Sequence, residues 1–528
     1  MRKRTILGGV LAVATLGMSG LAAPATAAPD ARLADVIPAP VEVRPNPAAD
    51  FWINPATQIR TQPGAKGAKR VGDYLAGVLR PATGYPLPVA ESRYSVLPTI
   101  SLVLGDAEAR IGKQGYQLDV TRKGVTIRAN SASGLFAGVQ TLRQLLPAEI
   151  ESSGPRLRAW TVPGGRILDY PRFGYRGAML DLARHFHTVP EIKRYIDDLA
   201  RYKINHLHLH LADDQGWRIQ IDSWPKLTAV GGGQGTGVDG AGGGYLTKAD
   251  YAELNEYAAA RQLTIVPEID MPGHTNAALS SYAELNCDGV APPPRTDMEV
   301  GYSSLCVGKE NTYAFVEDVI REVAAMTPGP YLHLGGDEAE ATTDADYRTF
   351  MRRVIPLVGK YGKRLAGWHE IAQADLPASA VPQFWDSAGG VDDNVARAAG
   401  NGSKILLSPA NKSYLDMKYN ENTELGLTWA GPTEVRDAYD WDPASAVRGV
   451  GERSVLGVEA PLWSETVRSI DDIEFLAFPR LPAIAEKGWS AKAGQDWESF
   501  RQRLAGHGPR WDLGGVNYYR SPQIPWPG

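Results

Sequence analysis

Short apolar runs alternate with amphipathic segments from about residue 170 onward, a pattern typical of a parallel sheet with crossover helices. Eight runs have strand character, at residues 175–181, 206–211, 264–269, 331–334, 364–368, 381–385, 404–408 and 455–460. Helical periodicity lies between several of them, at residues 190–202, 248–262, 345–361 and 472–486. The predicted fold class is therefore α/β, with a (β/α)8 TIM barrel that carries enlarged loops.

The segment before the barrel has a different, α+β pattern. Strand-like runs occur at residues 99–104, 116–120 and 125–128, and amphipathic helices fit residues 67–79 and 133–146. This segment shows no cluster of catalytic residue types. We therefore predict a smaller, non-catalytic α+β domain over residues 29–169, followed by the barrel over residues 170–528. Residues 29–49 are rich in Pro and Ala and are expected to form a linker before the first packed element.

The N-terminus has the pattern of a secretory signal peptide over residues 1–28. Arg2, Lys3 and Arg4 precede an apolar run at residues 6–21, and small residues follow it. A membrane anchor is the alternative, which the glycines in the run and the small-residue cleavage pattern disfavour. No other run is long enough to span a bilayer. We expect a secreted protein, cleaved near Ala27 or Ala28, with no membrane association afterwards.

Composition and charge limit the class of protein. Hydrophobic residues make up 43% of the chain and charged residues 22%, as in a folded globular protein. The formal net charge is −5, and it becomes −8 when the three basic residues of the signal peptide are removed. Without a Lys or Arg stripe, this balance argues against nucleic acid as a partner. The two cysteines, Cys287 and Cys306, are expected to form one disulfide, worth about 3 kcal/mol.

The stretch at residues 331–340 carries the clearest candidate chemistry. A short apolar strand breaks at Gly335 and Gly336 and then presents two adjacent carboxylates, Asp337 and Glu338. Neighbouring side chains on a strand point to opposite faces, so these two share a pocket only where the glycines let the backbone turn. Paired carboxylates at the end of a barrel strand suit general acid and base catalysis. An acidic helix N-terminus is the alternative explanation.

Two other patterns suggest competing chemistry. His206, His208 and His210 alternate on one predicted strand and face the same way, as in a zinc site of a barrel hydrolase. Later strands offer further ligands only in poor positions, so we favour histidines hydrogen-bonded inside the barrel and predict no metal. The Gly-rich stretch at residues 231–244 lacks the Lys-Ser or Lys-Thr of a phosphate loop and is expected to be a flexible surface loop.

Tryptophan is the next informative residue type, with thirteen in the chain. Trp368, Trp385 and Trp463 follow predicted strands and stand beside carboxylates. Single buried indoles usually belong to the core. Several at strand ends indicate a sugar pocket instead, because the apolar faces of a pyranose stack on aromatic rings while charged side chains bind its hydroxyls.

The motifs at these strand ends resemble those of the β-N-acetylhexosaminidases of glycoside hydrolase family 20. The matching stretches are residues 177–186, 207–215, 267–274 (Pro-Glu-Ile-Asp-Met-Pro-Gly-His), 333–338 (His-Leu-Gly-Gly-Asp-Glu), 367–370 and 463–465. They are distributed along nearly the whole length of residues 174–489. The small N-terminal domain also resembles the non-catalytic domain that precedes the barrel in this family.

The resemblance implies retaining, substrate-assisted hydrolysis through an oxazolinium intermediate. Glu338 would be the general acid and then the base, and the substrate's own 2-acetamido oxygen would be the nucleophile. Asp337 would orient the acetamido group and stabilise its positive charge, while Tyr414 would hold its oxygen. Arg184 would bind the hydroxyls at ring positions 3 and 4, and Glu465 those at positions 4 and 6.

The same resemblance assigns the surrounding residues. Asp416 and Trp429 would contact the sugar or its leaving side, and Asp213 and His274 would form a relay that steadies Glu338. The walls of the acetamido pocket would be three indoles, from Trp368, Trp385 and Trp463.

The expected protein is a secreted exo-acting glycoside hydrolase. Its partners would be oligosaccharides or glycans that end in β-linked N-acetylglucosamine or N-acetylgalactosamine, and no sequence feature calls for a cofactor. The alternatives are a zinc-dependent barrel hydrolase and a non-catalytic carbohydrate-binding protein. The intact pair of Asp337 and Glu338 argues against pure binding. The choice between gluco and galacto substrates and the oligomeric state stay open.

Overall fold

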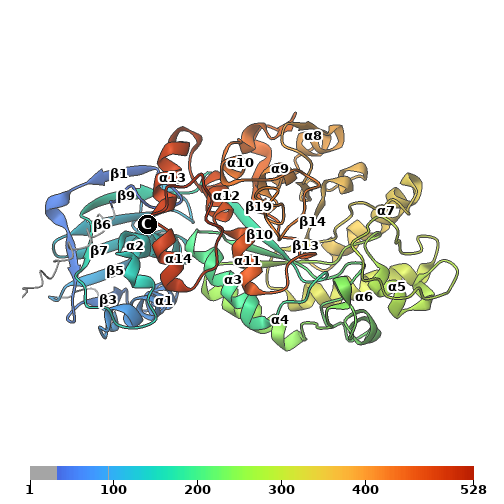
Figure 1. The fold of residues 1–528 in the computed structure, drawn as a ribbon, viewed down its shortest axis with the longest axis horizontal. Helices are drawn as coiled ribbons and strands as arrows, with labels where there is room; N and C mark the ends of the chain where they lie inside the picture. Colours follow the sequence, from blue (N-terminus) through green and yellow to red (C-terminus); the bar gives the residue numbers. More distant parts are fainter. Residues whose placement is uncertain (1–31, 93, 95, 528) are drawn as a thin grey trace, which may run out of the picture. The chain divides into compact units, whose positions relative to one another are not determined.

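The barrel predicted from the sequence is present and closed. The computed structural model describes residues 32–92, 94 and 96–527, so the predicted signal peptide lies outside the described residues. Eight parallel strands follow one another around the barrel in chain order, and the first pairs with the last (Figure 1). They are β10 (Tyr175–Asp181), β11 (His206–His210), β12 (Thr264–Glu268), β13 (Tyr331–His333), β14 (Arg364–Trp368), β15 (Val381–Phe384), β17 (Ile405–Leu407) and β19 (Val455–Ala460).

Helices connect these strands. Three lie close to the predicted positions: α3 (Val189–Arg201), α4 (Lys248–Ala260) and α7 (Asp344–Lys360). Two others, α6 (Glu310–Met326) and α8 (Asp393–Gly400), were not predicted. The single helix predicted over residues 472–486 is wrong. Two helices replace it, α11 (Ile470–Ala477) and α12 (Arg480–Trp489), and they are separated at Phe478 and Pro479. Proline has no amide hydrogen to continue the α11 ladder, so the first helix ends before it.

The N-terminal part contains a seven-stranded mixed sheet, in agreement with the predicted α+β domain. The strand order is β1 (Glu42–Pro45), β9 (Gly165–Asp169), β6 (Tyr116–Thr121), β7 (Gly124–Ala129), β5 (Thr99–Leu104), β3 (Gln58–Thr61) and β4 (Val89–Glu91). Helices α1 (Lys66–Thr83) and α2 (Ala132–Leu145) pack on it through apolar faces. Helix α14 (Gly508–Gly514), coloured red in Figure 1, lies beside α2, and α13 (Trp497–Ala505) precedes it in the chain. Arg510 on α14 donates to the carbonyl of Gln144 at 2.6 Å.

The linker expected at residues 29–49 is wrong for the described part of that segment. Leu33, Val36 and Ile37 are buried, and the Ile37 amide donates to Gln144 Oε1 at 2.8 Å. The side chains of alanine and proline form no hydrogen bonds, but these three buried apolar residues are enough to anchor the segment in the core. Within the described residues, no helix combines the length and the apolar character that a membrane crossing requires.

One buried carboxylate joins the small sheet to the barrel. Asp169 ends β9 and accepts hydrogen bonds from Tyr116 Oη at 2.8 Å, Lys203 Nζ at 3.0 Å and Trp489 Nε1 at 2.9 Å. Tyr116 belongs to the sheet, Lys203 follows the first barrel helix and Trp489 ends α12. The carboxylate is fully buried, so these donors replace the water that it loses.

We therefore expect Asp169→Ala to destabilise the protein by about 3–5 kcal/mol, because it leaves the Lys203 ammonium buried without its partner. Chemical denaturation monitored by tryptophan fluorescence measures this loss. Asp119→Ala is the matched control, since that carboxylate pairs with Arg128 at the surface and should contribute under about 1 kcal/mol. Equal losses in the two variants would contradict the assigned role of Asp169.

Candidate active site

The candidate catalytic residues gather at the carboxyl ends of the barrel strands. Asp181 ends β10, Asp213 follows β11, Asp270 follows β12, and Asp337 and Glu338 follow β13. Because parallel strands end at the same rim of a barrel, these side chains come together from distant parts of the sequence. The structure therefore places the predicted site where the fold requires one.

The turn after β13 separates the two adjacent carboxylates. Gly335 and Gly336 have φ values of +62° and +100°, and a Cβ on Gly335 would lie 1.8 Å from Asp270 Oδ1. The Gly336 amide donates to that same oxygen at 2.9 Å. Glu338 also has a positive φ of +42°, which is rare for a residue with a side chain. The Asp337 side chain is 10% exposed and the Glu338 side chain 36%, so the turn gives one buried and one accessible carboxylate.

Glu338 stands at the end of a relay. His274 Nε2 lies 3.4 Å from Glu338 Oε2 and 3.8 Å from Asp337 Oδ2, and His274 Nδ1 lies 3.1 Å from Asp213 Oδ1. Burial alone would lower the pKa of His274, but the carboxylates of Asp213 and Asp337 raise it well above its ordinary value. Asp213 and His274, predicted to steady Glu338, therefore lie in contact with each other and beside it.

Asp337 occupies a site that resists ionisation. Burial and the neighbouring charge of Glu338 raise its pKa to about 6, while His274 opposes the shift. Asp270 lies beside it, and burial together with the charge of Asp337 raises the pKa of Asp270 well above its ordinary value. Among the described residues, Asp337 Oδ1 has no hydrogen-bond partner although it is buried. That oxygen is therefore available to a donor from a bound molecule.

A cluster of aromatic rings lies close to Asp337, whose charge acts on the Tyr414 hydroxyl. Trp368 is fully buried and its ring centre lies 5.7 Å from that of Trp463. Tyr414 is also buried, and its ring centre lies 5.6 Å from that of Trp429 and 6.5 Å from that of Trp463. Trp385 lies 6.0 Å from Trp429, whose indole is 55% exposed. The five rings, three of which sequence position alone had singled out, form one aromatic enclosure that opens at Trp429.

Charged groups close the other side of the site. Arg184 contacts Asp213 Oδ2 at 2.9 Å and donates to Gln215 Oε1 at 3.0 Å, and its guanidinium carbon lies 4.9 Å from the Trp463 ring. Burial raises the pKa of Glu465, an effect that Arg184 opposes, and burial raises that of Asp416 well above its ordinary value. In the part of the chain that the structure describes, Glu465 Oε2 and Asp416 Oδ2 are buried without a hydrogen-bond partner. These oxygens can accept hydrogen bonds from the hydroxyl groups of a bound molecule such as a sugar.

The Gly-rich stretch at residues 231–244 is not the flexible surface loop that the sequence suggested. Thr236 and Val238 are buried, and the Val238 amide donates to the Arg184 carbonyl at 2.8 Å. Arg218 donates to Thr236 Oγ1 and to the Gly244 carbonyl, both at 3.1 Å. The glycines let the loop fold tightly around Arg218, and in doing so it supports the backbone of Arg184.

Sequence reasoning assigned no role to four further residues of the site: Gln215, Glu268, Asp270 and Glu370. Gln215 orients Arg184, Asp270 holds the turn of Asp337, and Glu370 accepts from Trp385 Nε1 at 3.1 Å. Burial and the charge of Asp337 raise the pKa of Glu370 to about 8. A signal was present, because all four stand at or just past predicted strand ends.

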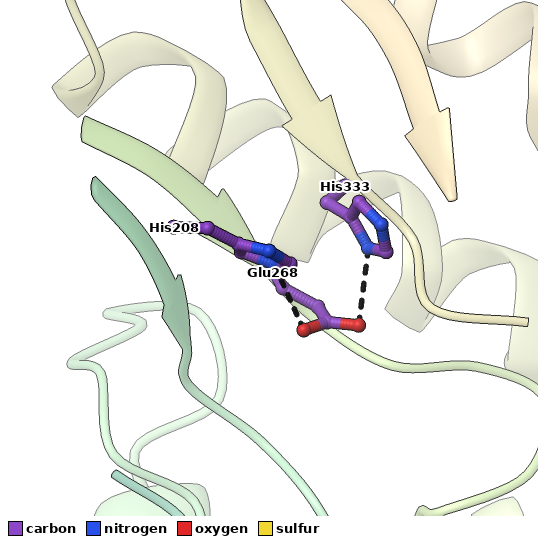
Figure 2. Close-up of side chains that lie close together, drawn as sticks. All are labelled: His208, Glu268 and His333. Carbon is purple, nitrogen blue, oxygen red and sulfur yellow. Dashed lines mark ion pairs between the residues drawn. The ribbon is translucent and has the colours of Figure 1, made fainter. Parts of the chain in front are cut away.

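The histidines on β11 do not form one zinc site. His206 stacks on Tyr175 with ring centres 3.8 Å apart, and it belongs to none of the groups of described residues that could hold an ion. His208 Nδ1 lies 2.9 Å from Glu459 Oε1, and His210 Nε2 lies 2.8 Å from Asp213 Oδ2. His208, Glu268 and His333 are close enough to bind one metal ion together (Figure 2). Both imidazoles, however, lie within 3.0 Å of the Glu268 carboxylate and are in direct contact with it. Contacts of this length between the groups support histidines hydrogen-bonded within the barrel.

The loop over residues 287–306 is closed by the expected disulfide between Cys287 and Cys306. Ser303 in this loop donates to Asp214 Oδ1 at 2.5 Å, and the carbonyl of Asp297 accepts from Gln215 Nε2 at 2.9 Å. The loop is thereby held against the residue that orients Arg184.

Comparison with known proteins identifies the family. The model of glycosyl hydrolase family 20, catalytic domain, matches residues 173–347 and 341–492, and that of domain 2 of the same family matches residues 34–170. The chain belongs to glycosyl hydrolase family 20. A β-N-acetylhexosaminidase of Cellulomonas fimi is 40% identical over 493 residues, which cover 93% of this chain and 97% of that protein.

Solved structures of family 20 agree with the fold. The β-N-acetylhexosaminidase of Streptomyces coelicolor is 54% identical, with a TM-score of 0.91 over 94% of this chain and 99% of that one. A mutant β-hexosaminidase of Streptomyces plicatus, in complex with its product GlcNAc, is also 54% identical, with a TM-score of 0.90 over 94% and 98% of the two chains. The family 20 protein described here is accordingly a glycoside hydrolase, as the strand-end motifs indicated.

The raised pKa of Asp337 predicts a cost in stability. Its value of about 6 exceeds the ordinary 3.8, so this group favours the folded state only while protonated. That contribution is complete below the ordinary value and is lost as the pH rises through about 6. Asp337→Asn should therefore stabilise the fold by up to about 3 kcal/mol above pH 7 and by little near pH 4.

Thermal unfolding of wild type and variant at the two pH values tests this expectation. Glu338→Gln is the control, because its more exposed side chain should give a small change at both pH values. An Asp337→Asn variant that is no more stable than wild type at neutral pH would show that the carboxylate is fully compensated in the folded protein.

Proposed function

We propose that this family 20 hydrolase is a secreted exo-β-N-acetylhexosaminidase that works by retaining, substrate-assisted hydrolysis. The observation that carries the proposal is the pairing of one buried carboxylate, Asp337, with one accessible carboxylate, Glu338, on a single turn. Only the accessible group is suited to exchange protons with a leaving group and with water. The buried group next to the aromatic enclosure is suited to a polar group of the substrate itself.

In the proposed first step, the carbonyl oxygen of the 2-acetamido group attacks the anomeric carbon. The bond to the glycosidic oxygen breaks, and protonated Glu338 transfers its proton to that oxygen. The product is an oxazolinium ion whose positive charge is shared with the ring nitrogen. Asp337 Oδ1, buried and without a partner among the described groups, accepts the N–H of this ion and stabilises its charge.

In the second step, the Glu338 carboxylate takes a proton from water, and the water oxygen attacks the anomeric carbon. The carbon–oxygen bond of the oxazolinium ring breaks, which restores the acetamido group with retention at the anomeric centre. Two displacements at one carbon give this retention. The relay from Asp213 through His274 keeps Glu338 in place through both changes of its protonation state.

The remaining groups fit one terminal sugar. Tyr414 would hold the acetamido oxygen, and the three indoles of Trp368, Trp385 and Trp463 would enclose its methyl group. Arg184 would bind the hydroxyls at positions 3 and 4, and the unpartnered carboxylates of Glu465 and Asp416 would accept from further hydroxyls. Trp429, the exposed ring at the opening, would contact the leaving side. The substrates would be oligosaccharides or glycans with terminal β-linked N-acetylglucosamine or N-acetylgalactosamine.

The proposal places the mature protein outside the cell. It rests on the signal-peptide pattern of residues 1–28 and agrees with the disulfide of Cys287 and Cys306, since disulfides persist in oxidising compartments. Neither alternative function is favoured. A zinc hydrolase would need one free ring nitrogen on each ligating imidazole, whereas both ring nitrogens of His208 and of His210 face carboxylates. A binding protein would gain nothing from burying Asp337 next to Glu338.

The acetamido group decides the mechanism. We expect hydrolysis of 4-nitrophenyl N-acetyl-β-glucosaminide and negligible hydrolysis of 4-nitrophenyl β-glucoside, with kcat/KM lower by roughly 10⁴-fold or more, because the glucoside lacks the internal nucleophile. The initial rate of nitrophenolate release measures both. Comparable rates would mean that a protein side chain is the nucleophile, and substrate assistance would be refuted.

Separate roles for the two carboxylates predict separate kinetic defects. Glu338→Gln should lower kcat by about 10²–10⁴-fold with a sugar leaving group but much less with 2,4-dinitrophenolate, which needs no proton. Asp337→Asn should lower kcat with both, because every substrate forms the same oxazolinium ion. Steady-state kinetics with the two substrates distinguishes the variants, and the same pattern in both would contradict the assignment.

A further inference from the structure

A file of buried imidazoles and carboxylates runs through the barrel below the catalytic turn, and the proposed mechanism does not use its lower part. Glu459 Oε1 lies 2.9 Å from His208 Nδ1, and His208 Nε2 lies 2.9 Å from Glu268 Oε2. The Glu268 carboxylate reaches His210 Nδ1 at 2.6 Å, and His210 Nε2 reaches Asp213 Oδ2 at 2.8 Å. Asp213 then continues through His274 to Glu338.

Glu268 is the branch point of this file. Its Oε2 contacts His208 and His210 on β11. Its Oε1 accepts from Trp368 Nε1 at 2.8 Å and lies 3.0 Å from His333 Nδ1. Figure 2 shows the carboxylate between the imidazoles of His208 and His333. In the strand register, Glu268 stands opposite both His210 on β11 and His333 on β13. The side chain is therefore fixed by contacts on both neighbouring strands.

The two oxygens of Glu268 lead to opposite halves of the site. From Oε2, the contacts pass through His210, Asp213 and His274 to the general acid Glu338. Oε1 accepts a hydrogen bond from Trp368 Nε1 and thereby holds an indole of the proposed acetamido pocket. Both paths are buried as far as His274 and Trp368, and only the last residue of the first path, Glu338, is accessible.

Glu268 is held as an anion by its surroundings. Burial alone would raise the pKa of this carboxyl, but His210, His333 and His208 lower it well below its ordinary value. The same contact raises the pKa of His210 well above its ordinary value, against the effect of burial. The chain from Glu268 to Asp213 thus alternates in charge, which fixes each ring and carboxylate in one orientation.

We propose that Glu268 is a positioning residue that couples the general acid Glu338 to the acetamido pocket at Trp368. It touches neither substrate nor reacting atoms, and it sets the geometry of both halves from one carboxylate. The inference rests on the function proposed above, because that function supplies the two roles being coupled.

Two substrate ratios, each measured on one enzyme preparation, test the coupling and are independent of the fraction of protein that is folded. The first compares kcat/KM for 2,4-dinitrophenyl N-acetyl-β-glucosaminide with that for N,N′-diacetylchitobiose, and it reports proton donation by Glu338. The second compares kcat/KM for 4-nitrophenyl glycosides of N-acetyl- and N-propanoyl-β-glucosamine, and it reports the fit of the acetamido pocket.

Glu268→Met removes both acceptor oxygens at similar volume. We expect the first ratio to rise by about tenfold or more, because loss of acid positioning harms only the poor leaving group. The second ratio should fall by roughly tenfold, because a loosened Trp368 admits the extra methylene. Glu268→Gln keeps one acceptor oxygen on a side chain of the same shape and should shift the first ratio in the same direction by less.

Glu459→Met and Glu459→Gln are the matched controls. Glu459 is an equally buried carboxylate that also contacts His208, but it bonds Tyr175 and Gln383 instead of Trp368 and His210. Both control variants should lose stability while keeping the two ratios within twofold of wild type, a limit set by the precision of such measurements.

The outcomes separate the claims. If both ratios of the Glu268 variants stay at the wild-type values, the carboxylate is merely structural and the inference is wrong. A shift in only one ratio of Glu268→Met would limit Glu268 to one branch and refute the coupling. A wild-type enzyme that hydrolyses glucosides as fast as N-acetylglucosaminides would instead refute the proposed function, and the inference with it.

Discussion

Every ionised carboxylate inside this barrel depends on a cationic or hydrogen-bonding partner, because water cannot reach it and an unpaired buried charge costs several kcal/mol. Arg184, His210 and His274 surround Asp213, and imidazoles on two neighbouring strands surround Glu268. Because of these pairings, charged side chains can occupy the barrel core as far as the rim. At the rim the pattern stops, and Asp337, Glu465 and Asp416 each keep a buried oxygen without a partner in the described chain. Three buried carboxylate oxygens without partners therefore gather at the rim, where a ligand can supply the missing donors.

Much of the fold followed from local periodicity. All eight barrel strands were predicted within about one or two residues of their ends, because each is a short run rich in apolar residues within the strand–helix alternation. The break between α11 and α12 was missed, since the apolar spacing continues across Pro479 and only the proline marks it. The packing of residues 33–37 was missed for the opposite reason. Three apolar residues in a segment of Pro and Ala are too few to show a period, yet tertiary contacts bury them.

The site was predictable at its rim and less so beneath it. Asp337, Glu338 and the three indoles stand at strand ends, where the barrel geometry gives position directly from sequence. Glu268 also stands at a strand end, but its importance lies in its register with His210 and His333, which no single segment reveals. The packed Gly-rich loop was misjudged because glycine content indicates backbone freedom and not whether a buried arginine such as Arg218 will fill the turn.

The junction at Asp169 has a consequence for the order in which this protein becomes complete during synthesis. Its carboxylate belongs to the small sheet, yet one of its donors, Trp489, lies 320 residues later in the chain. Lys203 is only 34 residues from Asp169, so it is synthesised long before the indole that completes the junction. Arg510, on the last helix, also binds the small sheet's helix α2. The N-terminal domain therefore reaches its final packing only when synthesis of the barrel is almost finished. In a chain released early, the contacts between the two domains stay incomplete.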